Sequence, residues 1–328
     1  MLDPQTSTPL PSGWDALNID KAEALRDPVS YQRRLNTAVE RALDQFKPDV
    51  LHCQHLCYGM TAALTRLRGI PKIGVCHGTD VIEACRNRKF RDSFRKNVRT
   101  LDRIIFPSRG ILSDARTILP IPAEKVRIVP WGLPARYLRL ERKLAQYCTE
   151  PFHILYAGRF DESKGIDLLI HALSALPEWV HLTLLGQGPI RSKLSNQIAQ
   201  LDLEKRVRFK PWQNRDDLQE TFAEYQLLVL PSREIEAFGL VSVEAQAAGL
   251  PAIVSRVSGL PETLPKRAGV LAFTSGDVHE LVDRIGLILG DQMLWSDLAM
   301  RCRANANRFK IQDTVDQFMT VSRSLIHA

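Results

Sequence analysis

The chain has 328 residues, of which 45% are hydrophobic and 25% are charged, a composition typical of globular proteins. Because this length exceeds one ordinary hydrophobic core, it predicts two domains. No window approaches the run of about 18 uncharged apolar residues that a membrane span requires, and the start MLDPQTSTPLPSGW has neither the basic nor the apolar segment of a secretion signal. We therefore expect a cytoplasmic protein.

The net charge of +7 is concentrated in the first half of the chain. Residues 1–150 hold 25 Lys and Arg against 16 Asp and Glu, whereas the rest hold 19 against 21. Within residues 86–103, arginines recur at helical spacing and apolar residues mark another face. Such a helix either presents a solvated outer face or makes a peripheral contact with an anionic membrane or a phosphorylated acceptor. No nucleic-acid-reading module accompanies the charge, so we expect no nucleic-acid partner.

The six cysteines form no CxxC pair and are interpreted as free thiols. The stretch HCQHLC (52–57) contains four residues that are competent metal ligands. Zinc sites usually draw on two separated clusters or on a helix, and strand alternation sends adjacent side chains to opposite faces. We therefore expect no metal site there, and no cofactor elsewhere.

From residue 49 onward, short β-branched runs alternate with longer amphipathic ones, the pattern of βα units around a parallel sheet. The expected strands of the first half are 49–53, 72–76, 103–107 and 126–130, and the expected helices are 30–46, 58–68, 87–101 and 108–118. The segment 131–150 is poorly periodic. We read it as the region where two domains join.

The alternation then restarts. The expected strands are 153–159, 181–186, 207–211, 227–231, 251–255 and a short 270–273, and the expected helices are 165–175, 189–201, 215–223 and 239–248, with two or three more after Asp277. The sequence thus predicts an α/β protein with two Rossmann-like domains facing each other across a cleft, where a ligand would bind. The N-terminal domain spans 1–135, a linker spans 136–150, and the C-terminal domain spans 151–328.

The stretch AGRFDESKG (157–165) places Gly158, Arg159 and Lys164 where a strand ends and a helix begins. Two cations at the carboxyl edge of a parallel sheet suit a diphosphate. They are alternatively a surface arginine and a helix-start lysine. The stretch LGQGP (185–189) is half of a dinucleotide fingerprint, and is either a tight turn or a ligand contact.

The stretch REIEAFGLVSVE (233–244) places two acids on either side of a helix start. Gly239 permits close backbone approach, and the N–H groups of Phe238, Gly239 and Leu240 form an anion site at the start of the helix. Glu236 precedes the helix and Glu244 lies about one turn inside it. Together they suit a ligand made of sugar, diphosphate and ribose; alternatively, Glu236 caps the helix and Glu244 pairs with an arginine.

In the first half, CHGTD (76–80) ends the strand 72–76. His77 is then either a structural residue or a hydrogen-bonding group for a reacting sugar or an acceptor hydroxyl.

These motifs, in this order, resemble the retaining glycosyltransferases of family 4, which have the GT-B fold; VPWGLP (129–134) is similar to the family's crossover between domains. The resemblance implies metal-independent transfer of a sugar from a nucleotide-diphosphate sugar to a hydroxyl acceptor, with front-face attack. It assigns the leaving diphosphate to Arg159 and Lys164, the donor sugar to Glu236, the ribose to Glu244, and the anomeric centre to His77.

The resemblance also implies a Gly-rich strand-loop-helix at the start of the N-terminal domain. The residues before 49 show no apolar strand followed by glycines, so we expect the first βα units of that domain to be missing. An alternative function is therefore a non-catalytic GT-B subunit that binds a nucleotide sugar or a partner glycosyltransferase.

Overall fold

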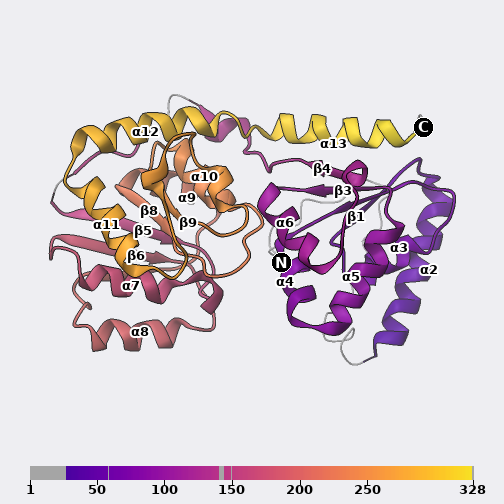
Figure 1. Cartoon of the computed structure of the whole chain (residues 1–328), viewed down its shortest axis with the longest axis horizontal. Helices are drawn as coiled ribbons and strands as arrows, with labels where there is room; N and C mark the ends of the chain where they lie inside the picture. Colours follow the sequence, from indigo (N-terminus) through magenta and orange to yellow (C-terminus); the bar gives the residue numbers. More distant parts are fainter. Residues whose placement is uncertain (1–26, 58, 140–143, 149, 327–328) are drawn as a thin grey trace.

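The computed structural model describes residues 27–57, 59–139, 144–148 and 150–326, which form two α/β bodies (Figure 1). The first body contains a parallel sheet, which among the described residues has four strands in the order β1-β2-β3-β4. These strands are β1 (Leu51–Gln54), β2 (Lys72–Val75), β3 (Arg103–Phe106) and β4 (Val126–Ile128).

The second body contains a parallel sheet that, within the described ranges, has six strands in the order β10-β9-β8-β5-β6-β7. Two of its interior strands, β8 and β9, are buried at every position, as expected where helices cover both faces. The six strands are β5 (Phe152–Ala157), β6 (Val180–Leu185), β7 (Val207–Lys210), β8 (Leu227–Leu230), β9 (Ala252–Ser255) and β10 (Ala272–Phe273).

Helices connect the strands, as the periodicity predicts. In the first body they are α2 (Pro28–Phe46), α3 (Gly59–Thr65), α4 (Gly78–Arg86), α5 (Arg88–Thr100) and α6 (Arg109–Ile118). In the second they are α7 (Ile166–Ser174), α8 (Arg191–Gln200), α9 (Arg215–Thr221), α10 (Leu240–Ala247), α11 (Val278–Leu289) and α12 (Gln292–Ala306). Short 3-10 turns are η1 (Ala123–Lys125), η2 (Ala135–Leu138), η3 (Glu162–Lys164), η4 (Phe222–Glu224), η5 (Leu260–Thr263) and η6 (Gly269–Leu271).

One helix, α4, is absent from the sequence-based expectation, which has a single helix at 87–101 after the second strand. The structure has two because Asn87 is extended, ending α4 while its side chain accepts a hydrogen bond from Lys89 N and caps α5. His77 therefore lies at the N-terminus of a helix as well as after a strand.

The last helix, α13 (Ile311–Ile326), returns to the first body and lies along β4 (Figure 1). Leu133 fixes the crossing, because its N–H donates to Phe309 O at 2.7 Å and its carbonyl accepts from Ile311 N at 2.9 Å. Val321 of α13 packs in the core of the first sheet, and Ser322 Oγ lies 2.9 Å from His52 Nε2. The C-terminal segment thus contributes to both bodies.

The bodies also meet at the loop 232–238. Ser108 Oγ donates to Ala237 O at 2.7 Å, and Arg86 forms an ion pair with Glu234. A Cβ atom added to Gly78 would lie 3.0 Å from Ala237 Cβ, so the start of α4 is in close contact with this loop.

Within the described residues, no helix has the length and apolar character needed to cross a membrane. The expectation of missing βα units concerns the region before β1; residues 1–26 lie outside the described residues, and α2 occupies 28–46.

Candidate functional site

A cavity of about 400 Å³ lies at the carboxyl ends of β5 and β8, and we call it the strand-end cavity. Seven of the nine residues that the sequence singled out line it, although they come from separate motifs. They are Gly158, Arg159, Lys164, Glu236, Gly239, Leu240 and Glu244.

The turn after β5 is held by Tyr156. Its hydroxyl donates to Arg159 O at 2.9 Å, and a Cβ atom on Gly158 would lie only 2.9 Å from that hydroxyl. Burial and the negative charge of Glu236 raise the pKa of Tyr156, so the phenol stays protonated and remains a donor. The turn therefore fixes the backbone from which Arg159 reaches the cavity.

Lys164 ends η3, which Asp161 caps by accepting hydrogen bonds from Ser163 N at 3.1 Å and Ser163 Oγ at 2.6 Å. These hydrogen bonds lower the pKa of Asp161 and keep it an acceptor. Gly165 follows with φ 63°, and a Cβ atom there would lie 2.1 Å from Pro231 O. The turn is thus pressed against the end of β8.

Inside the cavity, Lys164 Nζ forms an ion pair with Glu236 Oε2, and each side chain is 24% exposed. The pair joins the first motif to the second, which are 72 residues apart. Because the loop carrying Glu236 also contacts the first body, the ion pair lies beside the interface between the bodies.

Helix α10 opens toward the cavity from Gly239, which has φ 83° and ψ 55°. A Cβ atom at this position would lie 2.3 Å from Leu260 Cδ2, so both the conformation and the packing favour glycine. Glu244 lies in the second turn of α10 and is only 5% exposed. Glu244 lines the same cavity as Lys164 and the start of the helix.

The remaining two predicted residues lie outside the cavity lining. Phe238 is 2% exposed, and its ring packs edge-on against Phe309 with 5.5 Å between centroids. Its side chain therefore anchors the start of α10 to the segment that leads into α13.

His77 lies in the first body, at the start of α4. Its ring is 4.5 Å from the ring of His55 and 5.8 Å from that of Trp131, and its Nε2 is 3.0 Å from Gln54 Oε1. The buried carboxylate of Asp80 accepts from His77 N at 2.9 Å and so orients the helix start. Burial and the neighbouring His55 lower the pKa of His77, which favours a neutral imidazole.

Sequence reasoning missed Trp212 and Asp80. Trp212 lines the cavity, and the residue is 55% exposed. Its signal was the position just after β7, at the edge where ligands bind in open sheets. Asp80 was readable as the third residue after a helix-capping position, but only once α4 was recognised.

The LGQGP turn has a packing role. A Cβ atom on Gly186 would lie 1.9 Å from Gly158 O, and one on Gly188 would lie 2.1 Å from Phe160 O. These glycines let the turn after β6 lie against the turn after β5, and neither lines the strand-end cavity.

The described part of the chain contains no group of three or more His, Cys, Asp and Glu side chains that could hold a metal. Burial raises the pKa of Cys53 to about 11 and raises that of Cys57 further, with Asp80 adding to the latter. Both thiols therefore stay protonated at neutral pH.

Comparison with known families gives two matches along the chain. The model of the family described as "Glycosyl transferases group 1" matches residues 141–309, and that of "Glycosyltransferase Family 4" matches residues 21–136. The first covers more than half of the chain and contains the whole strand-end cavity.

Curated relatives carry related descriptions. The chain is 30% identical over 239 residues to D-inositol 3-phosphate glycosyltransferase of Xylanimonas cellulosilytica, covering 72% of this chain and 54% of that protein. It is 28% identical over 218 residues to an uncharacterized glycosyltransferase of Methanocaldococcus jannaschii, covering 60% and 55%. The chain thus spans about half the length of the curated relatives that it matches.

Solved structures share the fold. Sucrose-phosphate synthase from Thermosynechococcus elongatus superposes with a TM-score of 0.80 at 21% identity, over 94% of this chain and 81% of that one. HepE of Anabaena, solved in complex with UDP and glucose, superposes with a TM-score of 0.76 at 19% identity, over 92% and 83%. The predicted GT-B fold is thereby confirmed.

Proposed function

The chain belongs to the glycosyl transferases group 1 family, and on this basis we propose that it transfers a sugar from a nucleotide-diphosphate sugar to a hydroxyl acceptor. We propose further that the anomeric configuration is retained and that no metal is required. The donor binds mainly to 151–328, the acceptor is placed by 1–135, and 136–150 links the two.

The observation that carries the proposal is the content of the strand-end cavity. Two cations, Arg159 and Lys164, line a cavity of about 400 Å³ together with the glycine-led start of α10, and Glu236 and Glu244 line the same cavity. Cations and free backbone N–H groups are the usual partners of a diphosphate. Two carboxylates in the same cavity suit the hydroxyl groups of a sugar and of a ribose.

In the proposed reaction, the bond between the anomeric carbon and the diphosphate oxygen breaks while Arg159 and Lys164 neutralise the charge that develops on the leaving group. The acceptor hydroxyl attacks from the same face, and its proton passes to the departing phosphate oxygen. Attack on that face retains the configuration, and the protein supplies no separate base.

The acceptor side of the proposal centres on His77. Its ring lies between those of His55 and Trp131, in the body that contacts the Glu236 loop through Gly78. A neutral imidazole in this position can donate a hydrogen bond to the sugar near the anomeric carbon, or accept one from it. The lowered pKa of His77 is consistent with that state.

We also propose a peripheral contact with the inner face of an anionic membrane through 86–103, in the cytoplasm. Helix α5 buries Phe94 and Val98 while its outer face exposes basic side chains. These are Arg88, Lys89, Arg95, Lys96 and Arg99. Sedimentation with phosphatidylglycerol vesicles, compared with phosphatidylcholine vesicles, tests this contact; equal binding to both, or none, contradicts it.

The main test titrates UDP, GDP and ADP sugars while thermal stability is followed, and then seeks sugar transfer by mass spectrometry. We expect one nucleotide class to raise the unfolding free energy by about 2.7 kcal/mol at 100 times its Kd. Arg159→Ala and Glu236→Ala are expected to diminish that effect.

Three outcomes are distinguishable. Stabilisation together with product formation supports the enzyme. Stabilisation without product, across a broad set of acceptors, supports the non-catalytic subunit instead. A stabilisation that both variants leave unchanged would place the donor outside the strand-end cavity and overturn the site assignment.

A further inference from the structure

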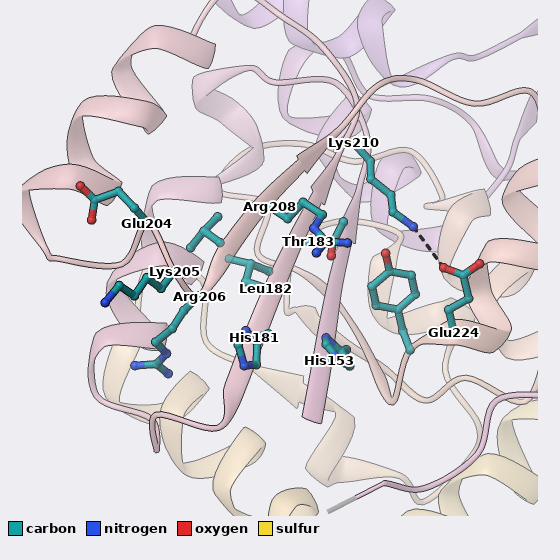
Figure 2. Close-up of a pocket in the computed structure, with 12 residues that line it drawn as sticks. His153, His181, Leu182, Thr183, Glu204, Lys205, Arg206, Arg208, Lys210 and Glu224 are labelled. Carbon is teal, nitrogen blue, oxygen red and sulfur yellow. Dashed lines mark hydrogen bonds and ion pairs between the residues drawn. The ribbon is translucent and has the colours of Figure 1, made fainter. Parts of the chain in front are cut away.

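A second cavity, of about 390 Å³, opens on one face of the second sheet, at β5, β6 and β7 (Figure 2). We call it the basic pocket. His153 is the second residue of β5, whereas the lining of the strand-end cavity begins at Tyr156, roughly 10 Å further along the strand. The two cavities share no lining residue.

Strand register assembles the basic pocket. His153 pairs with His181 across β5 and β6, and Thr183 pairs with Arg208 across β6 and β7. Because side chains alternate between faces along a strand, His181 and Thr183 share a face, as do Arg208 and Lys210. Figure 2 shows these five side chains lining one cavity.

The charge in this pocket is positive. Four cationic side chains line it, Lys205, Arg206, Arg208 and Lys210, against two carboxylates, Glu204 and Glu224. These cations differ in whether they already have a hydrogen-bond or ion-pair partner. Arg206 is committed to the carbonyls of Val180, Leu176 and Pro177, and Lys210 lies 3.1 Å from Glu224 Oε2.

Arg208, by contrast, has no hydrogen-bond or ion-pair partner among the described residues, and it is exposed. Thr183 is only 6% exposed as a residue, and it lines the pocket. Its hydroxyl makes no hydrogen bond within the part of the chain that the structure describes, and it is not one of the buried polar atoms that lack a partner there. The hydroxyl is therefore accessible from the pocket and free to donate to a bound ligand.

His153 responds to the same positive field. Their rings lie 5.4 Å apart, and burial lowers the pKa of His153, with His181, Arg208 and Lys210 lowering it further. An anion in the pocket would oppose the lowering by these cations and would accept hydrogen bonds from the groups that have no partner.

We propose that the basic pocket binds a phosphate group, either inorganic phosphate or the terminal phosphate of a phosphate monoester, at a site separate from the sugar-nucleotide cavity. Arg208 supplies two guanidinium N–H groups, Thr183 donates its hydroxyl, and the imidazoles of His153 and His181 complete the ring of donors. A phosphate suits this set because it offers several acceptor oxygens and a charge of nearly −2 at neutral pH.

The experiment titrates the intact chain with inorganic phosphate at constant ionic strength, using sodium chloride as the reference salt, while NMR follows the imidazole resonances. We expect saturable shifts of His153 and His181 and a higher pKa of His153 in the bound state. Arg208→Ala and the nearly isosteric Thr183→Val are expected to weaken binding at least tenfold.

Two controls separate the pocket from other effects. Lys266→Ala removes an exposed lysine elsewhere in the second body and is expected to leave the titration unchanged. Arg159→Ala alters the strand-end cavity and is expected to leave the His153 response intact. Loss of sugar-nucleotide binding can therefore be distinguished from loss of phosphate binding in the basic pocket. Shifts that are absent, or that persist undiminished in Thr183→Val and Arg208→Ala, would overturn the phosphate site.

Discussion

Glu262 of the second body binds the first two backbone N–H groups of α6 in the first body, with Oε2 3.0 Å from Arg109 N and Oε1 2.7 Å from Gly110 N. The carboxylate thus occupies the positive end of a helix dipole across the interface. Gly110 makes this approach possible, since a Cβ atom there would lie 2.0 Å from Ser258 O.

We expect Glu262→Gln to loosen this contact, because the neutral amide keeps only one oxygen acceptor and loses the attraction to the dipole. Hydrogen bonds to charged groups contribute about 1.5–3 kcal/mol each, so part of the population should open. Small-angle X-ray scattering would show a larger radius of gyration. Glu178→Gln, which removes an exposed carboxylate, is the matched control, and an equal change in both variants would refute the interpretation.

The ion pair between Lys164 and Glu236 predicts opposite effects of two substitutions on UDP binding. Lys164→Met should weaken binding about tenfold or more, because a diphosphate loses a charged donor. Glu236→Gln should leave UDP binding as tight or tighter, since it releases Lys164, while lowering sugar transfer. Isothermal titration calorimetry measures the UDP affinity of both variants, and a transfer assay measures the activity.

Lys193→Met is the control for that pair, because Lys193 bonds Glu162 at 2.8 Å outside the cavity lining. Weaker UDP binding in Glu236→Gln than in the unmodified chain would show that Glu236 does not compete for the lysine.

Gly239→Ala should destabilise the fold through both strain and collision. A left-handed conformation costs a non-glycine residue roughly 1–2 kcal/mol, and the new methyl group would meet Leu260. Gly276→Ala isolates the first cost, since Gly276 has φ 85° with open space around it. Urea unfolding should therefore show a larger loss for Gly239→Ala; equal losses would mean that Leu260 yields without cost.

Trp212→Ala should weaken nucleotide binding by about 1–3 kcal/mol if the base stacks on the exposed indole at the cavity edge. Trp212→Phe should keep most of the affinity, because a phenyl face also stacks. The comparison uses UDP and is made by calorimetry. Unchanged affinity in the alanine variant would place the base elsewhere in the cavity.

His77 should make stability depend on pH. Its folded-state pKa lies below the ordinary value of 6.5, so protons favour the unfolded chain. The contribution of the neutral imidazole is complete above about pH 6.5 and is lost as pH falls through that value toward the folded pKa. We expect His77→Gln to reduce the loss of unfolding free energy between pH 8 and pH 5.

His171→Gln, at an exposed position, is the control and should leave that pH dependence unchanged. Some dependence should remain in His77→Gln, because burial also lowers the pKa of His52 and of His153. An identical slope in the His77 variant and the unmodified chain would contradict the prediction.

Seven of the residues that line the strand-end cavity could be predicted from the sequence because each belongs to a short motif that is contiguous in the chain. Gly239 follows a buried strand and opens a helix, and the turn around Arg159 has the same form, so each predicts its own place at the carboxyl edge of a sheet. What the spacing did not predict is the ion pair between Lys164 and Glu236, which depends on β5 and β8 being neighbours.

The basic pocket could not be predicted from the sequence, because it too depends on which strands are neighbours. His153 and His181 are 28 residues apart, and only the pairing of β5 with β6 places them side by side. The helix α4 was missed because the expected helix begins only at residue 87, where the extended Asn87 ends α4 and caps α5. Local pattern thus predicted the elements, whereas register and helix breaks decided which side chains meet.

The return of α13 limits how this molecule can open. The polypeptide passes between the bodies at Leu133 and again at 309–311, and these two passages are bonded to each other. Because the two passages lie side by side, they join the bodies at one place rather than at two distant ones. The Glu262 contact with the start of α6 is a separate link between the same two bodies, so the bodies are joined at the crossing and at this contact.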